Sequence, residues 1–583
     1  MFTKKQLSRL LAALITCGLV LSILLVGPMA QARLITLTID GRPLDAGIEA
    51  VLVNRTPMVP MRAVFEALGA DVAWDNALGA VVARNGDHLA RVHIGASFAV
   101  VNDKIVPLPE AARMERGRTM VPFALVGLFF GVDTHWDSTT NIARILTAKG
   151  PRNVIFIHPD GTTPEFFAAA RMLHYGPDGE LNWDRMPAAA VYKGHMRNNL
   201  VGTSNAGAVT HAYGVKVHDA SFGMDETGNP VVARSGQPIT ILEEAKAAGF
   251  SVGMINTGTI TEPGTGVWAA RVVNRNDHAG IAREIIMRPH DQLIDVIFGG
   301  GEVWFLPNTV VGRHGFRGRR TDGLNLITVA RERGYTVIFT REELLNLPAG
   351  TTRVLGIFAG FDTYNDNNEE AMPQPFGYPY TEEQLRAEGL QDYDPNAPTF
   401  AQMMAAAIKI LSRNQTRGFY LVAEEEGTDN LSNFALNARG TIEATKRADD
   451  AIGVAIDFAA KNPNTLVITA ADSEASGFSI IGNPALTAGN VTPTVTLRAL
   501  DGSIRFVEYL DGRDGTNTPP FMSAPDRNGQ RWPFAIAWSS RADHSGSIVA
   551  RAFGRYSEML SGTIDNTDIY RIKYRVLFGR VLP

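Results

Sequence analysis

From Pro151 to the end of the chain, short apolar segments alternate with segments rich in alanine. The apolar segments have the composition of buried strands, and the alanine-rich segments that of helices. The clearest predicted strands are residues 154–157, 251–255, 296–298, 336–339, 418–423 and 466–469. This alternation predicts an α/β fold in which a doubly wound, mostly parallel sheet is sandwiched by helices. In such sheets, functional residues gather in loops at the carboxyl ends of the strands.

The chain before Pro151 contains an internal duplication. Residues 55–83 and 118–145 share one pattern, and equivalent positions are 62 residues apart. Val59-Pro60 recurs as Val121-Pro122, Gly69 as Gly131, and Trp74-Asp75 as Trp136-Asp137. In each copy, apolar spacing after Val-Pro predicts a helix that ends at the glycine, followed by a short strand with the tryptophan.

This duplicated segment resembles the copper amine oxidase N-terminal-like repeat, which is often called a stalk domain in bacterial surface proteins. The resemblance implies a small α+β domain of two repeats over residues 33–148, ahead of the α/β domain at residues 151–583. Nothing in it suggests a copper site. We therefore expect a spacer, or a module that attaches the protein to a cell wall or cell surface, without a catalytic role.

The first 32 residues have the pattern of a secretory signal peptide. Basic residues up to Arg9 precede an apolar run at residues 10–26, and a small-x-small cleavage motif ends at Ala32. We expect cleavage after Ala32 and a secreted or cell-surface protein. An uncleaved membrane anchor is the alternative, because the run is nearly long enough to span a bilayer. The only cysteine, Cys17, lies in this run, so the mature chain has no thiol.

The length of the chain bears on the number of domains, and its charge bears on the class of binding partner. A chain of 583 residues is too long for one compact core, so two or more domains are expected. The formal net charge is −5, and the chain has no long run of either sign. The charge therefore gives no reason to expect nucleic acid as a partner.

Two polar motifs follow predicted strands in the α/β part. Asp160-Gly161 comes directly after the first strand, and Ser204 opens an alanine-rich helix. A serine at a helix N-terminus lies beside unpaired backbone N–H groups and the positive end of the helix dipole, which favour an alkoxide and a bound phosphate. The alternative is a serine that only caps the helix.

An ordered set of motifs supports the phosphate interpretation. These are Asp160-Gly161, Ser204, Arg275, Gly299-Gly300-Gly301, Glu424, Asp429, Asp472 and His544-Ser545-Gly546. With them, residues 151–583 resemble the alkaline phosphatase superfamily. The resemblance implies a phosphomonoesterase in which two zinc ions and a neighbouring magnesium ion hold the phosphate. It also implies that Ser204 is the nucleophile and that Arg275 binds two phosphate oxygens.

The resemblance further implies a set of metal ligands at matching positions. They are Asp160, Ser204, Glu262, Glu424, Asp429, Asn433, Asp472, Ser473 and His544. Two of them depart from the family, because Asn433 and Ser473 stand where histidines are usual, and Thr203 replaces the aspartate before the nucleophile. Such a histidine-poor site should favour Mg²⁺, with Ca²⁺ or Mn²⁺ as alternatives and Zn²⁺ only at weakened sites. Glu425, Glu426 or Glu474 could supply a compensating carboxylate.

Two functions fit these observations. The first is an exported, metal-dependent phosphomonoesterase that acts on a phosphorylated small molecule through a phosphoserine intermediate. The second is a catalytically degenerate cell-surface protein that keeps the fold for binding or structure. The sulfatase and phosphodiesterase branches of the superfamily are nearby alternatives. A sulfatase is disfavoured, because the only cysteine, Cys17, lies in the predicted signal peptide and is not placed for conversion to formylglycine. The sequence leaves the substrate, the native metal and the oligomeric state open.

Overall fold

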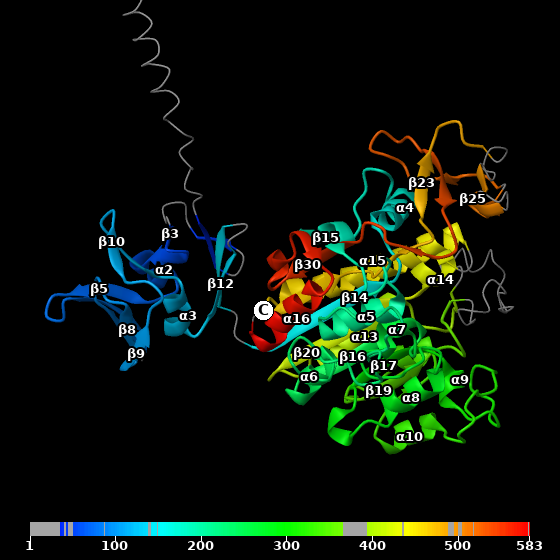
Figure 1. The fold of residues 1–583 in the computed structure, drawn as a ribbon, viewed down its shortest axis with the longest axis horizontal. Helices are drawn as coiled ribbons and strands as arrows, with labels where there is room; N and C mark the ends of the chain where they lie inside the picture. The colour runs from blue at the N-terminus through cyan, green and yellow to red at the C-terminus, as the bar shows by residue number, and fades with distance from the viewer. Residues whose placement is uncertain are drawn as a thin grey trace, which may run out of the picture. The chain divides into compact units, whose positions relative to one another are not determined.

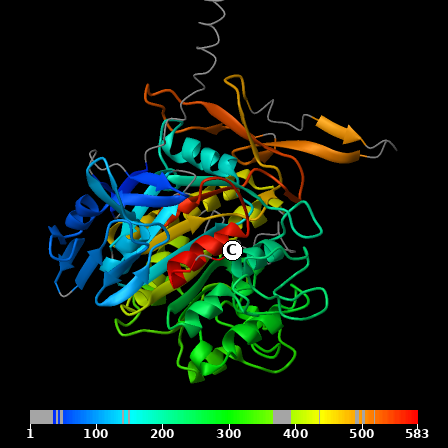
Figure 2. The ribbon, with the colours of Figure 1, turned by 60° about the vertical axis from the view of Figure 1, so that its left-hand side comes forward.

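The computed structural model divides the chain into two compact units, residues 1–149 and residues 150–583 (Figures 1 and 2). It describes residues 35–39, 42–44, 50–86, 88–137, 141–147, 150–364, 393–433, 436–487, 495–498, 504–516, 518–580 and 582. The predicted signal peptide lies outside these residues. None of the described helices combines the length and the apolar character that crossing a membrane requires.

The smaller unit contains two four-stranded sheets and one five-stranded sheet. The first sheet has the order β12-β13-β1-β2, the second β10-β11-β4-β3 and the third β5-β6-β7-β8-β9. The strands are β1 (Thr36–Ile39), β2 (Arg42–Pro43), β3 (Val51–Val53), β4 (Thr56–Pro60), β5 (Asp71–Asp75), β6 (Ala80–Asn85), β7 (His88–Val92), β8 (Phe98–Val101), β9 (Lys104–Pro107), β10 (Arg113–Glu115), β11 (Arg118–Pro122), β12 (Asp133–Asp137) and β13 (Ile142–Leu146).

The duplication is visible in this unit as two matching strand–helix–strand segments. Strands β4 and β11 pair antiparallel, and their register is centred on the equivalent residues Val59 and Val121, which lie opposite each other. Helices α2 (Met61–Ala67) and α3 (Ala124–Phe130) follow these strands. Both end where the sequence predicts, because Gly69 and Gly131 adopt φ values of 85° and 63°, which favour glycine. The two tryptophan-containing segments form β5 and β12.

The larger unit is built on a ten-stranded sheet with the order β18-β19-β17-β16-β20-β14-β21-β30-β15-β31. The seven strands from β18 to β21 in this order are parallel, and β30 adds antiparallel to β21. The strands are β14 (Arg152–Pro159), β15 (Ala188–Lys193), β16 (Ser251–Thr259), β17 (Val296–Gly300), β18 (Thr336–Ile338), β19 (Val354–Ile357), β20 (Gly418–Glu425), β21 (Thr465–Thr469), β30 (Val549–Gly554) and β31 (Gly562–Asp565). The predicted doubly wound fold is confirmed.

Helices cover both faces of this sheet (Figure 1). Helices α13 and α15 pack on one face, and α6, α7 and α16 pack on the other, with α5 against α16. The helices are α4 (Pro164–Tyr175), α5 (Ser204–Tyr213), α6 (Ile241–Ala247), α7 (Pro263–Gly266), α8 (His278–Ile286), α9 (Glu302–Phe305), α10 (Leu326–Glu332), α11 (Arg341–Leu345), α13 (Phe400–Leu411), α14 (Gly427–Asn433), α15 (Ala438–Lys461) and α16 (Asp568–Phe578), with 3₁₀ turns at Trp183–Arg185, His290–Gln292 and Ser557–Met559.

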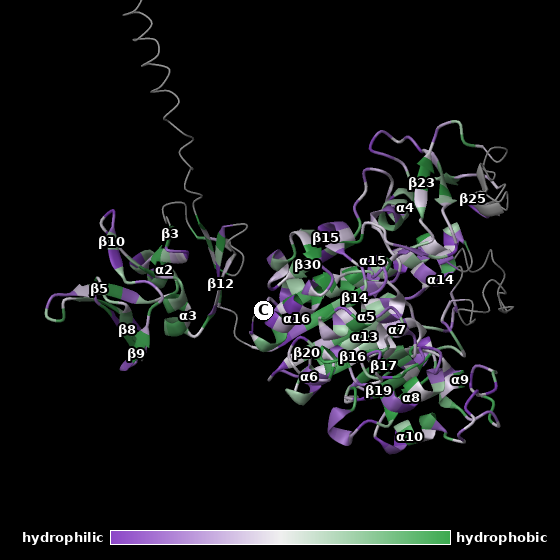
Figure 3. Ribbon diagram, in the orientation of Figure 1, coloured by the Kyte–Doolittle hydropathy of each residue, from purple (hydrophilic) through white to green (hydrophobic). Residues whose placement is uncertain are grey.

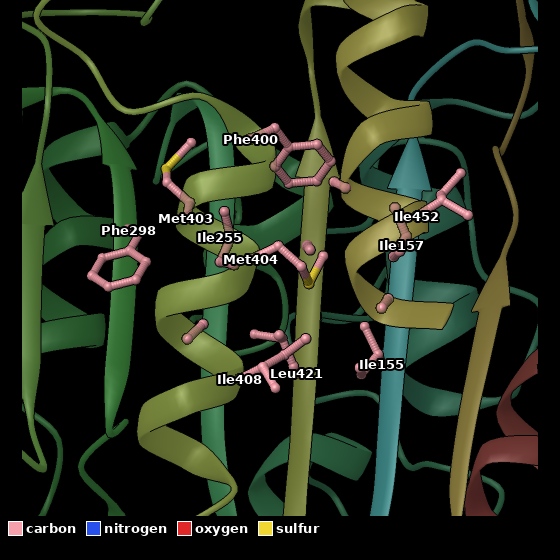
Figure 4. Close-up of a cluster of buried hydrophobic side chains, with 14 of the residues drawn as sticks. Ile155, Ile157, Ile255, Phe298, Phe400, Met403, Met404, Ile408, Leu421 and Ile452 are labelled. Atoms are coloured by element: carbon pink, nitrogen blue, oxygen red, sulfur yellow. The ribbon is translucent and has the colours of Figure 1, made fainter. Parts of the chain in front are cut away.

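The main hydrophobic core lies between the parallel strands and helices α13 and α15 (Figure 4). Ile155 and Ile157 of β14 point toward these helices, and Met404 of α13 packs over Leu421 of β20. Side chains alternate between the faces of a strand, so the intervening Phe156 lies on the other face, near Lys573 of α16. The central strands are the most hydrophobic part of the ribbon in Figure 3.

A smaller antiparallel sheet lies beside α4 at one end of this unit (Figures 1 and 2). It contains β23 (Ser479–Gly482), β24 (Val495–Arg498), β25 (Ile504–Gly512), β26 (Gly515–Thr516), β27 (Phe521–Met522) and β28 (Pro533–Trp538). Nearby in sequence, β22 (Glu474–Ala475) pairs with β29 (Asp543–His544). This short pairing links the segment after β21 to the segment that carries His544.

The core generates a stability prediction. Leu421 is fully buried at the centre of the sheet, so Leu421→Ala should lower the free energy of unfolding by about 2–5 kcal/mol. Leu345→Ala on α11 is the control, because its side chain is 61% exposed and its loss should cost less than about 0.5 kcal/mol. Urea denaturation monitored by circular dichroism measures both. Equal effects of the two variants would contradict the described core.

Candidate active site

The central parallel strands end together at one edge of the sheet. Strand β14 lies between β20 and β21, and its register places His158 opposite Glu424 and Ile157 opposite Thr469. Asp160 follows β14, Glu424 lies at the end of β20, and the loop after β21 carries Asp472. The three carboxylates therefore meet at the carboxyl edge, where α/β sheets place their functional sites.

The imidazole of His158 lies among these three carboxylates. Its Nε2 is 3.2 Å from Asp160 Oδ1 and 3.9 Å from both Glu424 Oε1 and Asp472 Oδ1. Its Nδ1 lies 2.7 Å from the backbone oxygen of Ala470. All of these side chains are buried, with His158 only 1% exposed. The contacts fix both the position and the direction of the ring.

Two overlapping groups of ligand atoms share Asp160. His158, Asp160 and Glu424 form one group, and Asp160, Glu426 and Asp429 form the other, with ligand atoms within 4.8 Å of one another in each. Asp429 can approach because Gly161 has no side chain. A Cβ there would lie 2.8 Å from Asp429 Oδ1.

The residues at this edge fit divalent cations. Several buried polar atoms have no hydrogen-bond partner, namely His158 Nε2, Asp160 Oδ2, Glu424 Oε1, Glu426 Oε2 and Asp472 Oδ2. Buried polar groups without partners are costly, and clustered carboxylate oxygens repel each other. Carboxylate oxygen and imidazole nitrogen are the donors that Mg²⁺, Mn²⁺ and Zn²⁺ bind, so a cation among them would satisfy these atoms.

The electrostatics of the cluster point the same way. Burial, opposed in part by His158, raises the pKa of Glu424 to about 8. Burial and the charge of Asp160 hold the pKa of Asp472 well above its usual range, and burial and the charge of Glu424 do the same for the pKa of Glu426. Ionising these carboxylates together therefore costs free energy. A bound cation would lower that cost, because its positive charge stabilises the ionised forms.

Asn433, which stands where a histidine is usual in the family pattern, joins two carboxylates. Its Nδ2 donates to Asp429 Oδ1 at 2.7 Å and to Asp543 Oδ1 at 2.9 Å, and its Oδ1 accepts from Ser476 Oγ at 2.9 Å. In this orientation the amide nitrogen faces the two carboxylates, and the amide oxygen faces Ser476. Ser473 Oγ lies 3.4 Å from Asp472 Oδ1, to which it donates.

His544 lies on β29, opposite Glu474 of β22. Its ring is half-buried, and its Nε2 is 2.8 Å from Ser540 Oγ. Within the described chain, this ring forms no hydrogen bond with a carboxylate of the cluster. The neighbouring Asp543 contacts the cluster instead, through Asn433, and burial together with the charge of Asp160 raises the pKa of Asp543 to about 6.

Ser204, the predicted nucleophile, is the first residue of α5. The cap itself is Thr203, whose hydroxyl accepts from the backbone N–H of Ala206, so Ser204 is not needed for capping. Asp472 packs on the first turn of this helix, because a Cβ at Gly207 would lie 2.3 Å from Asp472 Cβ. The N-terminus of α5 is therefore in direct contact with the carboxylate cluster.

Arg275 and the start of α5 line one cavity of ≈ 400 Å³. The lining residues are Thr203, Asn205, Asp219, Ala220, Val273, Asn274 and Arg275. Arg275 Nη2 lies 3.8 Å from Glu262 Oε2, and Glu262 is a buried residue that precedes α7. Arg275 thus lines the cavity and forms an ion pair with one buried acidic residue.

Comparison with known families agrees with this geometry. Residues 151–577 match the family described as alkaline phosphatase. The chain belongs to the alkaline phosphatase family. Residues 38–145 match the copper amine oxidase N-terminal domain. Both predicted resemblances are confirmed, and membership makes the larger unit a phosphatase-type hydrolase in a family that uses divalent metals.

The similar proteins are distant in sequence. The chain is 27% identical to the membrane-bound alkaline phosphatase of Bombyx mori over 73% of this chain and 80% of that protein. It is 25% identical to the alkaline phosphatase of Escherichia coli (strain K12), over 74% of this chain and 88% of the relative. A mutant alkaline phosphatase from the Antarctic bacterium TAB5, with Mg bound in its M3 site, has a TM-score of 0.51 at 21% identity, covering 74% of this chain and 98% of that one. This structural likeness supports the alkaline phosphatase fold.

The structure adds residues that sequence reasoning passed over. His158 and Asp543 were not among the predicted site residues, and Glu426 was considered only as one of several compensating carboxylates. A signal for His158 was available, since it lies on β14 two positions before Asp160, which follows the strand, and side chains two apart in an extended segment share a face. Asp543 had no such signal, because the β22–β29 pairing positions it.

The close packing of Asp472 on α5 generates a prediction. Gly207→Ala should displace Asp472, and we expect divalent-ion affinity and phosphatase turnover to fall by at least about tenfold. Gly350→Ala is the control, because a methyl group there meets no atom within 4 Å. Equilibrium dialysis with Mn²⁺ and a phosphate-release assay measure the two effects. Unchanged ion binding in Gly207→Ala would exclude Asp472 from the metal site.

Proposed function

We propose that this protein is an exported phosphomonoesterase that forms a phosphoserine at Ser204. The observation that carries the proposal is the contact of α5 with the buried carboxylates, because it joins a serine at a helix N-terminus to a cation site in an alkaline phosphatase fold. Thr203 and Asn205, the two neighbours of Ser204 in the chain, line one cavity with Arg275, which supports the same assignment. A phosphorylated small molecule is the proposed substrate.

The protein's own residues account for the two chemical steps. Arg275 would bind two phosphate oxygens through its planar guanidinium. Ser204 Oγ then attacks phosphorus and gives its proton to solvent, while the ester P–O bond breaks. The leaving alkoxide takes up a proton from solvent and departs as an alcohol. Water cleaves the phosphoserine, which restores the serine hydroxyl and releases inorganic phosphate. Backbone N–H groups at the start of α5 stabilise the negative charge on Oγ.

The acidic residues would hold the divalent cations. Asp160, Glu424, Glu426, Asp429 and Asp472 offer oxygen ligands, and Glu262 lies beside Arg275. Bound there, the cations supply positive charge and Lewis acidity beside the transferred phosphoryl group. Glu262, Glu424 and Asp160 are proposed for the magnesium side, because they combine oxygen donors with burial.

The proposal also covers the secretion of the protein and the role of its N-terminal domain. The N-terminal pattern of residues 1–32 supports secretion, and the match of residues 38–145 to a small non-catalytic type of domain supports a spacer or an attachment to the cell wall or surface. The net charge of −5 argues against nucleic acid as a partner.

A second candidate is a degenerate binding protein with this fold. Two observations favour it: the Asn433 amide occupies the space between Asp429 and Asp543, and the His544 ring is bonded to Ser540. This candidate requires that no divalent ion restores turnover to the pure protein.

The nucleophile assignment is tested by Ser204→Ala. The variant should lose turnover while divalent-ion binding changes little, because the hydroxyl oxygen carries the covalent step. Mass spectrometry of the acid-quenched wild type should find a phosphoryl group on the peptide containing residue 204. Ser412→Ala, at the C-cap of α13, is the control. Full turnover in Ser204→Ala would eliminate the phosphoserine mechanism.

Metal preference is tested at the two positions that lack histidine. We expect Mg²⁺, Mn²⁺ or Ca²⁺ to support more turnover than Zn²⁺ alone, because Asn433 and Ser473 offer no imidazole nitrogen. Asn433→His combined with Ser473→His should shift the preference toward Zn²⁺. Asn462→His, before the amino end of β21, is the control. A wild type that is most active with Zn²⁺ would refute this preference.

A further inference from the structure

The direction of the His158 ring distinguishes it from an ordinary buried histidine. Nδ1 lies 2.7 Å from the carbonyl oxygen of Ala470, which only accepts hydrogen bonds, so Nδ1 carries a proton. In the neutral ring the lone pair is then on Nε2. That atom points at the oxygens of Asp160, Glu424 and Asp472, and it has no hydrogen-bond partner.

A lone pair directed at carboxylates is repulsive unless Nε2 is protonated or a metal ion lies between them. The spacing suits a metal ion, since two ligands about 2.1 Å from a tetrahedral ion are about 3.4 Å apart. The three Nε2–oxygen distances of 3.2, 3.9 and 3.9 Å bracket that value. A histidine that donates its other N–H to a backbone carbonyl is also the usual arrangement around protein metal sites.

The surrounding structure holds the ring in place. His158 lies on β14, and its ring packs beside those of Phe156 and His211, whose centroids are 6.1 and 5.9 Å away. The side chain is 1% exposed and cannot turn toward solvent without disrupting this packing. The imidazole is therefore preorganised with its Nε2 at the edge of the acidic cluster.

We propose that His158 is an imidazole ligand of a divalent cation held together with Asp160 and Glu424. This histidine is outside the ligand set that the family pattern implies for this chain. It supplies one nitrogen to a centre in which Asn433 and Ser473 have replaced histidines. This inference rests on the proposed function in one respect, namely that a divalent cation binds at this edge of the sheet. Its test measures ion binding and does not require phosphatase turnover.

One nitrogen among several carboxylates has a chemical consequence. The ligand set remains dominated by oxygen, so Mg²⁺ and Mn²⁺ still fit. At this position, however, ions that accept imidazole, such as Mn²⁺, Co²⁺ and Zn²⁺, gain over Ca²⁺, which prefers oxygen alone. The position that includes the His158 nitrogen therefore differs in ion selectivity from positions that have oxygen ligands alone.

The test compares His158→Asn with His211→Asn in the full-length protein. The asparagine amide can keep the hydrogen bond to Ala470 but removes the nitrogen that faces the carboxylates. His211 is an equally buried histidine that contacts the His158 ring without facing the carboxylates, so it controls for the loss of a buried imidazole. Equilibrium dialysis with Co²⁺ and Zn²⁺ measures affinity, and the visible spectrum of bound Co²⁺ reports nitrogen ligation.

We expect His158→Asn to lose at least about 10- to 100-fold in affinity, the range seen even for outer partners of metal ligands. His211→Asn, which leaves the His158 nitrogen in place, should lose clearly less. Affinity in His158→Asn equal to or higher than that of the wild type would overturn the proposal. Higher affinity would show that His158 acts as a protonated counter-ion instead.

A second measurement covers the case in which His158→Asn does not fold. Mn²⁺ bound to His544→Asn should still show electron spin echo coupling to an imidazole nitrogen, which then comes from His158. Absence of that coupling would also overturn the proposal. If the coupling is present but the wild type has no turnover with any ion, the phosphatase function fails and the His158 ligand remains.

Discussion

Repulsion between buried carboxylates is the constraint on which the site depends. Asp160, Glu424 and Asp472 lie where β14, β20 and β21 end side by side, and Glu426 and Asp429 follow within a few residues. Two like charges 4 Å apart repel by about 4 kcal/mol at an effective dielectric constant of about 20. A fold that gathers so many acidic groups in its interior must balance them with positive charge. A divalent cation at this edge supplies it and brings catalytic capacity to the same place.

The neighbouring backbone is shaped by that cluster. Glycines stand where a side chain would collide with an acidic residue, as at Gly161 beside Asp429, Gly207 beside Asp472, and Gly264 beside Glu424. Through Gly207, the cluster contacts the helix that begins with Ser204. Helix α7, which contains Gly264, is preceded by Glu262, the neighbour of Arg275. The elements that we propose to bind phosphate are thus positioned by the same close contacts that assemble the acidic groups.

Sequence reasoning reached the parallel sheet because its buried strands are continuous apolar runs. All six predicted strands are present, although β19 (Val354–Ile357), a short run after a loop, was not predicted. The strands β15, β30 and β31 were also missed. Burial alternates along β15 and β30, as it does in many surface segments, and β31 has no buried residue. In the site, the carboxylates could be placed because they follow strands. The orientation of Asn433 and the place of Asp543 could not, because both depend on tertiary pairing. His158 was overlooked because it lies inside the strand, where apolar packing is the usual expectation.

A crystal structure grown with Mn²⁺ and inorganic phosphate, with anomalous diffraction data at the manganese edge, tests the central claim most directly. The account predicts an anomalous peak within bonding distance of Asp160 and Glu424, and a phosphate between Ser204 Oγ and the guanidinium of Arg275. Crystals with manganese bound only elsewhere, and with no phosphate beside Ser204, would contradict it.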